Sequence, residues 1–243
     1  MKESEKIVSW IQEYFQTNGK GCKAIIGISG GTDSSVCAAL CAKALGKENI
    51  VGVLMPNGIQ KDIDVSLALV KHLGIPYHIV NIQNATAALR DEIGAVLKVE
   101  PNDYDVYKSN TPSRIRMSVL YGICGILGGR VVNTCNLSED YVGYSTKFGD
   151  AAGDFSPISS LTKTEVKEIG RELGLPSLFV DKVPDDGMSG LSDEEKLGFT
   201  YAVLDHYILT GEIEDQAIKE KIDRLHRNNL HKLLPMPRYE KQR

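Results

Sequence analysis

Residues 22–46, CKAIIGISGGTDSSVCAALCAKALG, contain a glycine turn between two apolar runs. The first run is short and rich in isoleucine, as in a buried strand, and the second has the apolar spacing of a helix. The turn, Ser29-Gly30-Gly31-Thr32-Asp33-Ser34, therefore lies where a strand passes into a helix. A helix N-terminus after such a turn binds anions through its free N–H groups. The stretch predicts a phosphate site.

The rest of the chain continues this alternation of strands and helices. We expect strands at 49–55, 77–82 and 130–134, and helices at 3–15, 62–74, 85–98, 114–128 and 161–174. Residues 100–113, which are polar and contain two prolines, are expected to form a loop. Such alternation implies right-handed crossovers and a parallel sheet covered on both faces. We therefore expect an α/β fold, a Rossmann-like doubly wound parallel sheet flanked by helices, as one domain over residues 1–243. The glycine turn and the segment after Thr134 would face one crevice at the carboxyl ends of the strands.

Composition excludes several classes of protein. The net charge of −4 argues against general nucleic-acid binding. No stretch of 18 apolar residues is present, so we expect no membrane span, and the mixed-charge N-terminus does not resemble a signal peptide. The five cysteines are scattered and odd in number, which suits a reducing cytoplasm better than a disulfide framework.

The glycine turn differs from two better-known phosphate loops. A Walker loop needs a lysine after its last glycine, but Thr32 and Asp33 stand here, and the spacing does not fit a dinucleotide fingerprint either. The amides of Gly30 and Gly31, with the hydroxyls of Ser29 and Ser34, can donate to an oxyanion. The Asp33 carboxylate can approach phosphate only through a divalent cation. The turn thus predicts bound magnesium pyrophosphate, as released from ATP. The alternative is a simple capped turn in which Asp33 only stabilises the helix start.

Ser-Gly-Gly-x-Asp-Ser after a buried strand resembles the ATP pyrophosphatase, or PP-loop, superfamily, with its adenine nucleotide alpha-hydrolase-like fold. Members of that superfamily adenylate a carbonyl or carboxyl oxygen, and a nitrogen or sulfur nucleophile then displaces AMP. The motif alone does not choose among them.

The second half of the chain resembles one member, the NAD synthetase family. Residues 133–166, NTCNLSEDYVGYSTKFGDAAGDFSPISSLTKTEV, are similar to its core segment. SRIRMSVLYG at 113–122, VPDDGMSGLSDEEKLGFTY at 183–201 and LHKLLP at 230–235 are similar to its arginine-bearing helix, its mobile loop and its C-terminal His-Lys. The resemblance runs from about residue 6 to residue 237. The chain opens directly on the synthetase part, without an amidase domain, and so resembles the ammonia-dependent enzymes.

The resemblance implies a reaction in two steps. The nicotinate carboxylate of deamido-NAD attacks the α-phosphate of ATP, and ammonia then displaces AMP to give NAD. ATP is the co-substrate and Mg2+ the metal. A cytoplasmic homodimer with deamido-NAD at its interface is also implied, with no nucleic acid or membrane as partner.

The resemblance also implies roles for individual residues. The residues expected to contact ATP are Gly27, Ile28, Ser29, Gly30, Gly31, Thr32, Asp33, Ser34, Thr134, Lys163 and Asp185. Asp33 and Glu139 would bind magnesium. The residues expected to hold deamido-NAD are Arg114, Lys147, Asp154, His231 and Lys232. Asp185 departs from the family, which usually has Ser or Thr there. Arg116, two residues from Arg114, would point elsewhere on a helix and is expected to be structural or to lie at an interface.

Three other functions fit parts of the pattern. A sulfur-inserting tRNA enzyme of the same superfamily would need reactive cysteines and a basic surface. GMP synthetase shares the loop but not the segment around Lys147. A non-catalytic ATP-binding module would not need both Asp33 and Glu139.

Residues 184–190 and the region around His231 and Lys232 are rich in polar residues, Gly and Pro. We therefore expect them to lack fixed structure without ligands and to close as a lid.

Overall fold

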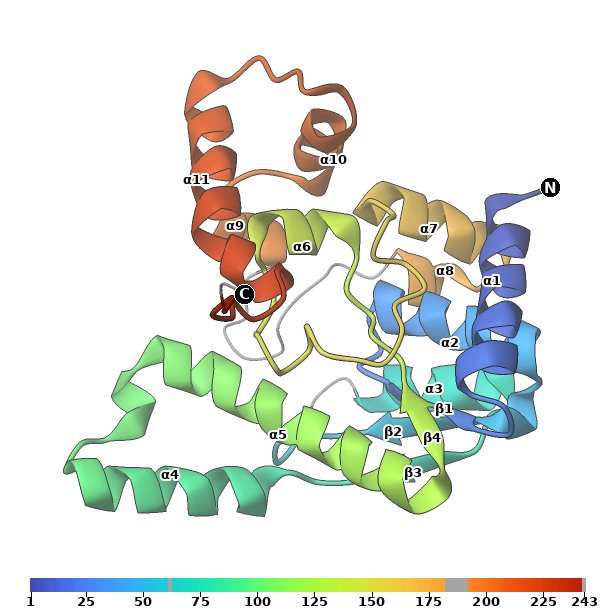
Figure 1. Ribbon diagram of the computed structural model, residues 1–243, viewed down its shortest axis with the longest axis horizontal. Helices are drawn as coiled ribbons and strands as arrows, with labels where there is room; N and C mark the ends of the chain where they lie inside the picture. The colour runs from blue at the N-terminus through green and yellow to red at the C-terminus, as the bar shows by residue number, and fades with distance from the viewer. Residues whose placement is uncertain (61–62, 182–191, 242–243) are drawn as a thin grey trace.

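The computed structural model describes residues 1–60, 63–181 and 192–241. Its centre is a four-stranded parallel sheet in the order β3-β2-β1-β4 (Figure 1). The strands are β1 (Lys23–Gly27), β2 (Ile50–Leu54), β3 (Tyr77–Ile79) and β4 (Gly129–Val131). In the register, Ile25 of β1 pairs with Val51 on one side and Val131 on the other. The expected parallel α/β sheet is confirmed.

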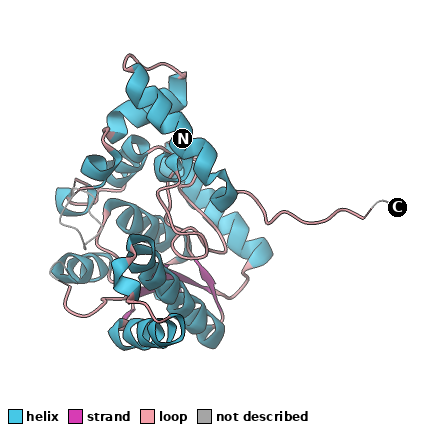
Figure 2. Cartoon of the chain, turned by 90° about the vertical axis from the view of Figure 1, so that its left-hand side faces the viewer, coloured by secondary structure: helices cyan, strands magenta, loops and turns pink. Residues whose placement is uncertain are grey.

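Helices cover both faces of this sheet, as Figures 1 and 2 show. One face carries α1 (Glu3–Asn18), α2 (Thr32–Leu45), α3 (Ile63–Leu73) and α7 (Lys163–Glu172), and the other carries α5 (Asp105–Leu127), with α4 (Gln83–Leu97) beside it. Successive strand side chains point to opposite faces. Accordingly Ala24 and Ile26 pack with the first group of helices, and Ile25 packs against α5. The fold is doubly wound.

The remaining helices are short or belong to a smaller lobe. They are α6 (Leu137–Val142), α8 (Ser177–Val180), α9 (Asp193–Leu197), α10 (Tyr201–Thr210) and α11 (Gln216–Leu233), with 3-10 turns η1 (Lys47–Asn49) and η2 (Pro101–Asp103). Val142, Leu204 and Ile222 centre a hydrophobic cluster that joins α6, α10 and α11. This lobe stands above the sheet in Figure 1. No helix within the described ranges is long and apolar enough to cross a bilayer.

The strand order places a crevice above β1 and β4. The chain leaves β1 toward α2 on one face and reaches β4 from α5 on the other, so the connections diverge there. Ligands of such sheets bind at this switch point, beyond the carboxyl ends of the strands. Asn136, after β4, donates from Nδ2 to Asp33 Oδ1 at 3.0 Å, after β1. The two segments that the sequence places at the carboxyl ends of the strands are thus in direct contact.

The expectation of a loop at 100–113 is wrong for most of its length. Helix α5 begins at Asp105 and continues through Pro112. An interior proline removes one helical hydrogen bond, which normally weakens a helix. Here Thr111 and Pro112 are buried, so packing against the rest of the protein outweighs the propensity of the isolated segment.

The C-terminal expectation also needs correction. His231 and Lys232 lie in the last turn of α11, not in an irregular segment. The helix ends at Leu233, and the following residues carry no regular structure up to residue 241, extending away from the molecule in Figure 2. Residues 184–190, with Asp185, lie outside the described residues.

Candidate active site

The glycine turn is shaped by close packing against α3. Gly30 has φ +82°, in the left-handed region that glycine enters without strain. A Cβ on Gly30 would lie 2.9 Å from Ser66 Oγ, so a larger residue has no room. Gly31 caps the start of α2 and accepts a hydrogen bond from the Ser35 hydroxyl at 2.8 Å. These contacts hold the backbone of residues 28–31 against the N-terminus of α2.

The hydroxyl groups of the turn have partners within the protein. The Ser29 and Ser34 oxygens lie 3.1 Å apart, and Ser29 Oγ accepts from the Gly31 amide at 3.2 Å. Thr32 Oγ1 donates to the Val180 carbonyl at 3.0 Å in a buried contact. Thr32 thus anchors α2 to α8 through its side chain, which leaves its backbone as the part that can meet a phosphate.

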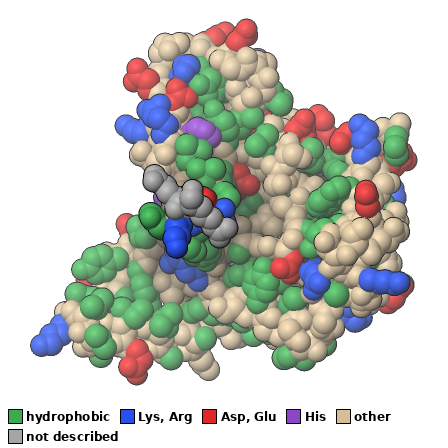
Figure 3. Space-filling model, in the orientation of Figure 1, with side chains coloured by type: hydrophobic (Ala, Val, Ile, Leu, Met, Phe, Trp, Pro, Cys, Tyr) green, Lys and Arg blue, Asp and Glu red, His purple; other side chains and the backbone are tan. Residues whose placement is uncertain are grey.

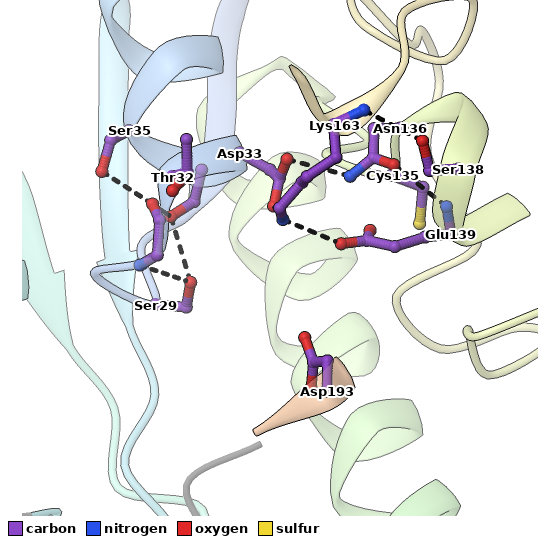
Figure 4. Close-up of polar contacts among 12 residues, drawn as sticks. Ser29, Thr32, Asp33, Ser35, Cys135, Asn136, Ser138, Glu139, Lys163 and Asp193 are labelled. Carbon is purple, nitrogen blue, oxygen red and sulfur yellow. Dashed lines mark hydrogen bonds and ion pairs between the residues drawn. The ribbon is translucent and has the colours of Figure 1, made fainter. Parts of the chain in front are cut away.

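A buried lysine lies between the two predicted metal ligands (Figure 4). Lys163 Nζ is 2.5 Å from Asp33 Oδ2 and 3.1 Å from Glu139 Oε1. The three residues stand at the starts of three helices, α7, α2 and α6. The lysine side chain is 3% exposed and each carboxylate side chain 16% exposed. Three residues that the sequence assigns to ATP or metal therefore converge on one point.

Burial and charge shift the pKa values of this cluster. Burial raises the pKa of Glu139 to about 7, against the opposing charge of Lys163 and with the help of Asp33. Burial alone would lower the pKa of Lys163, but the charges of Asp33 and Glu139 outweigh it and raise that pKa. The ammonium is therefore firmly protonated, and it is the cation that the two acids share.

Asn136 links the two acids, and the sequence analysis missed it. Its side chain is fully buried. Oδ1 accepts from the Glu139 amide at 3.0 Å, which caps α6, and Nδ2 donates to Asp33 Oδ1. Asn-x-x-Glu at 136–139 is the spacing of a helix-capping sequence, so the cap itself was detectable. Its contact with Asp33, 103 residues away, was not.

Two more residues surround the cluster. Lys163 Nζ lies 5.3 Å from the centre of the Tyr201 ring, and the Tyr201 hydroxyl is buried without a hydrogen-bond partner among the described residues. Asp193, on α9, points toward the cluster in Figure 4, and its Oδ1 accepts from Tyr144 Oη at 3.0 Å. No pattern in the sequence distinguishes Tyr201 from an ordinary core aromatic residue.

The residues predicted to hold deamido-NAD also come together. Arg114 Nε donates to the Lys147 carbonyl at 3.2 Å, and Lys147 Nζ donates to the His231 carbonyl at 2.5 Å. Lys232 Nζ donates to two carbonyls of the 143–147 loop, at 2.7 and 2.9 Å. Four residues from three distant parts of the chain thus meet where α5, this loop and α11 approach one another.

Two adjoining cavities lie at this place, and both are lined in part by Lys232. One measures about 310 Å3 and includes Lys147 and Phe148 in its walls. The other measures about 560 Å3 and includes Asp140 and Asp154.

Three further residues singled out in the sequence lie near the end of β4 or on α5. Asp154 accepts from the Val131 amide at 2.7 Å and from Tyr121 Oη at 3.3 Å. Thr134 follows β4 and is half-buried. Arg116 Nε donates to the Met55 carbonyl at 3.0 Å, which ties α5 to the end of β2.

Comparison with known proteins identifies the family of the chain. The family model described as NAD synthase matches residues 3–242. The chain belongs to the NAD synthase family. A relative from Thermococcus sibiricus, named NH(3)-dependent NAD(+) synthetase, is 41% identical over 221 residues, which are 90% of this chain and 84% of the relative.

Two solved structures resemble the fold over nearly its whole length. An NH3-dependent NAD synthetase from Campylobacter jejuni has a TM-score of 0.78 at 29% identity, with 98% of this chain and 97% of that chain covered. A structure described as NMN synthetase, from Francisella tularensis, has a TM-score of 0.86 at 32% identity, with 97% of both chains covered.

Proposed function

We propose that this NAD synthase family member joins ammonia to deamido-NAD at the expense of ATP, giving NAD, AMP and pyrophosphate through an adenylated carboxylate. Family membership carries the reaction class. The observation that supports this chemistry is the pair of acids, Asp33 and Glu139, that bind the buried Lys163 ammonium beside a glycine turn. A sulfur-inserting or GMP-forming PP-loop enzyme is less consistent with these relatives. We further propose that the chain acts as one synthetase domain in the cytoplasm, which is compatible with its five free cysteines.

The acidic pair fits a hard divalent cation. The two carboxylates converge on a single cation already, the Lys163 ammonium. No group of three or more metal-binding side chains occurs in the described parts of the chain. A two-carboxylate site suits magnesium, which keeps several waters and takes its other ligands from substrate phosphates. When bound, it would neutralise the charge of the departing pyrophosphate.

Lys163 would then change partners. While ATP is absent, its ammonium compensates the buried charges of Asp33 and Glu139. With magnesium held by the two acids, the Lys163 ammonium would be free to pair with phosphate oxygens at the adjacent glycine turn. The chain thus keeps a cation beside the acids at each stage, and a four-carbon stem is long enough for such a change.

For the second substrate, the chain offers a cationic surface rather than a buried pair. Lys147 and Lys232 line cavities large enough for part of a dinucleotide, and Arg114 contacts the backbone of Lys147. Their present partners are backbone carbonyls, which they can exchange for phosphate or carboxylate oxygens. The main catalytic contribution of the protein would be to position the nicotinate carboxylate against the α-phosphate.

Product analysis tests the reaction directly. The protein is incubated with Mg·ATP, deamido-NAD and ammonium, and NAD and pyrophosphate are quantified. We expect both products in equal amounts, with little pyrophosphate from ATP alone. Pyrophosphate release that is independent of deamido-NAD and of any mononucleotide would contradict the proposal.

A second candidate substrate follows from the Francisella structure described as NMN synthetase. An enzyme that forms NMN by the same chemistry would amidate the corresponding mononucleotide acid, nicotinate mononucleotide. The ratio of kcat/KM for the two acids decides between them. We expect a preference for deamido-NAD, and a preference for the mononucleotide would move the assignment to the second candidate.

We also propose a homodimer. Helices α4 and α5 expose large apolar side chains, seen at the lower left of Figure 3. Val96 and Val106 are more than two-thirds exposed, and so is Ile126. Sedimentation velocity of the wild type and of Ile126→Glu tests this. A wild type that stays monomeric at micromolar concentration with full activity would refute the dimer.

A further inference from the structure

The start of helix α7 is held by side chains from two other helices. The first N–H groups of a helix have no partner within it. In α7, the Lys163 amide donates to Ser138 Oγ at 2.9 Å and the Thr164 amide donates to Asp205 Oδ2 at 2.8 Å. Ser138 Oγ in turn donates to Asp205 Oδ1. The Asp205 carboxylate, on α10, thus accepts two hydrogen bonds and supports a third.

This small network lies immediately behind the acidic cluster. Ser138 directly precedes Glu139 on α6, and Lys163 is the first residue of α7. Ser138, Lys163 and Asp205 are 0%, 2% and 4% exposed. One carboxylate therefore joins the two segments that supply a metal-facing acid and the phosphate-facing lysine.

We propose that Asp205 is a positioning residue that fixes Glu139 and Lys163 relative to each other. This inference rests on the proposed function. Asp205 accepts from the Thr164 amide and the Ser138 hydroxyl, so it acts on the cluster through the backbone of α7 and through Ser138. If Lys163 passes between the acids and the phosphates, its backbone has to stay in place while its stem moves.

The chemistry of the contact suits that role. A carboxylate at a helix N-terminus is stabilised by the helix dipole and by hydrogen bonds to a charged acceptor, which are stronger than neutral ones. Removing the Asp205 carboxylate would leave the Thr164 amide and the Ser138 hydroxyl without their acceptor, so the first turn of α7 would shift to find other partners. A shift of about 1 Å at a reacting group is enough to slow an enzyme by about 100-fold.

The same lobe supplies a matched control. Asp223, on α11, accepts from Tyr207 Oη at 2.7 Å and from Lys219 Nζ at 2.8 Å. It belongs to a side-chain network of similar size, but neither of those partners lies on α6 or α7. Asp223→Asn thus disturbs the lobe without touching Glu139 or Lys163.

The experiment compares Asp205→Ala, Asp205→Asn, Ser138→Ala and Asp223→Asn in the full chain. Steady-state kinetics give kcat and the separate KM values for ATP and deamido-NAD, and calorimetry gives the affinity for Mg·ATP without turnover. We expect Asp205→Ala to lower kcat/KM for ATP by about 30- to 100-fold. Its KM for deamido-NAD should stay within about twofold. Asp205→Asn should recover part of the loss, because its remaining oxygen still accepts from Thr164.

Several results would overturn the inference. One is that Asp205→Ala and Asp223→Asn match in both kinetics and Mg·ATP affinity. Another is that the KM values for the two substrates rise equally. If Asp205→Ala does not fold, Asp205→Asn and Ser138→Ala decide by the same criteria. A wild type that forms neither NAD nor NMN would refute the proposed function instead, while the calorimetric comparison would still judge the role of Asp205.

Discussion

The two halves of the crevice are built by opposite means. On the glycine-turn side, the lysine side chain is 3% exposed and the two acid side chains 16%, and each charged group faces another charged side chain. On the α5–α11 side, Arg114 and His231 are exposed, and the cations Arg114, Lys147 and Lys232 face backbone carbonyls. Buried ion pairs are rigid and destabilising to break, whereas cations on carbonyls exchange partners readily. We therefore expect the proposed ATP side to be preformed and the proposed dinucleotide side to be adaptable.

This difference predicts where substitutions should be most damaging. Changes on the ATP side should affect both the fold and the chemical step. Changes on the dinucleotide side should affect the binding of one substrate. The following variants test that division, in order of falling effect.

Lys163→Ala should have the largest effect. It leaves two carboxylates in a buried site without their cation, which should lower the free energy of unfolding by about 3 to 5 kcal/mol. Activity should be lost as well. Because a divalent cation can replace the ammonium, magnesium should raise the melting temperature of this variant more than that of the wild type. Thermal unfolding with magnesium and with EDTA measures both effects.

Lys219→Ala is the control for Lys163→Ala. Its ion pair with Asp223 is about one-third exposed and screened by solvent, so its loss should change the free energy of unfolding far less. A Lys163→Ala protein as stable as Lys219→Ala would show that the cluster does not depend on its lysine.

Asp33→Asn and Glu139→Gln come next. Each keeps the shape of the side chain but removes a negative charge that would hold magnesium against pyrophosphate. We expect kcat to fall by about 100-fold, in line with the loss of one electrostatic contact to a developing charge. Asp181→Asn, which breaks an exposed pair with Arg171, should leave kcat unchanged. Normal turnover by either variant at saturating magnesium would contradict the metal assignment.

The ATP side was also the more predictable half of the site. The turn at residues 29–34 can be recognised from the sequence because its strand, two glycines and acid are adjacent along the chain. Glu139 and Lys163 came only through family resemblance, since nothing local distinguishes them from surface residues. Asn136 and Asp205 were not predicted, because each contacts a residue far away in the sequence. Asn136 contacts a residue 103 positions away, and Asp205 one 41 positions away. Such contacts follow from the packing of helices and cannot be read from local pattern.

The fold shows the same limit. Alternation of apolar runs correctly predicted the four parallel strands and the two layers of helices. It failed at residues 105–113, where Pro112 suggested a loop and burial of Thr111 and Pro112 favours a helix. It also failed around His231, because the polar face of α11 resembles an irregular tail when the apolar contacts of the lobe are unknown.

Lys232→Ala should act on the other side of the crevice, with a smaller effect. The variant loses two hydrogen bonds to the 143–147 loop, and burial already lowers the pKa of this lysine. We expect the KM for deamido-NAD to rise by about 10-fold, the equivalent of one charge-assisted hydrogen bond, and the KM for ATP to stay within about twofold. Arg238→Ala, on the exposed tail, should change neither value. Equal increases in both KM values would remove the distinction between the two halves.

Asp140→Asn should have the smallest effect, and on stability alone. Burial raises the pKa of Asp140 to about 6, with a further contribution from Asp150. Between about pH 4 and pH 6 the unfolded chain has already lost this proton while the folded protein still holds it. Stability therefore falls as the pH rises through this window, and the full penalty is present above it.

The Asp140→Asn variant is free of that penalty. Because the side chain is only partly buried, screening reduces the gain to about 1 kcal/mol, or a melting temperature about 2 to 4 °C higher at pH 7.5. The gain should shrink at pH 5 and vanish near pH 4. Asp103→Asn, at an exposed site, is the control. A gain of the same size at pH 5 and pH 7.5 would mean that hydrogen bonding, not charge, sets the effect. The negative charge of Asp140 would then not lower the stability of the folded protein.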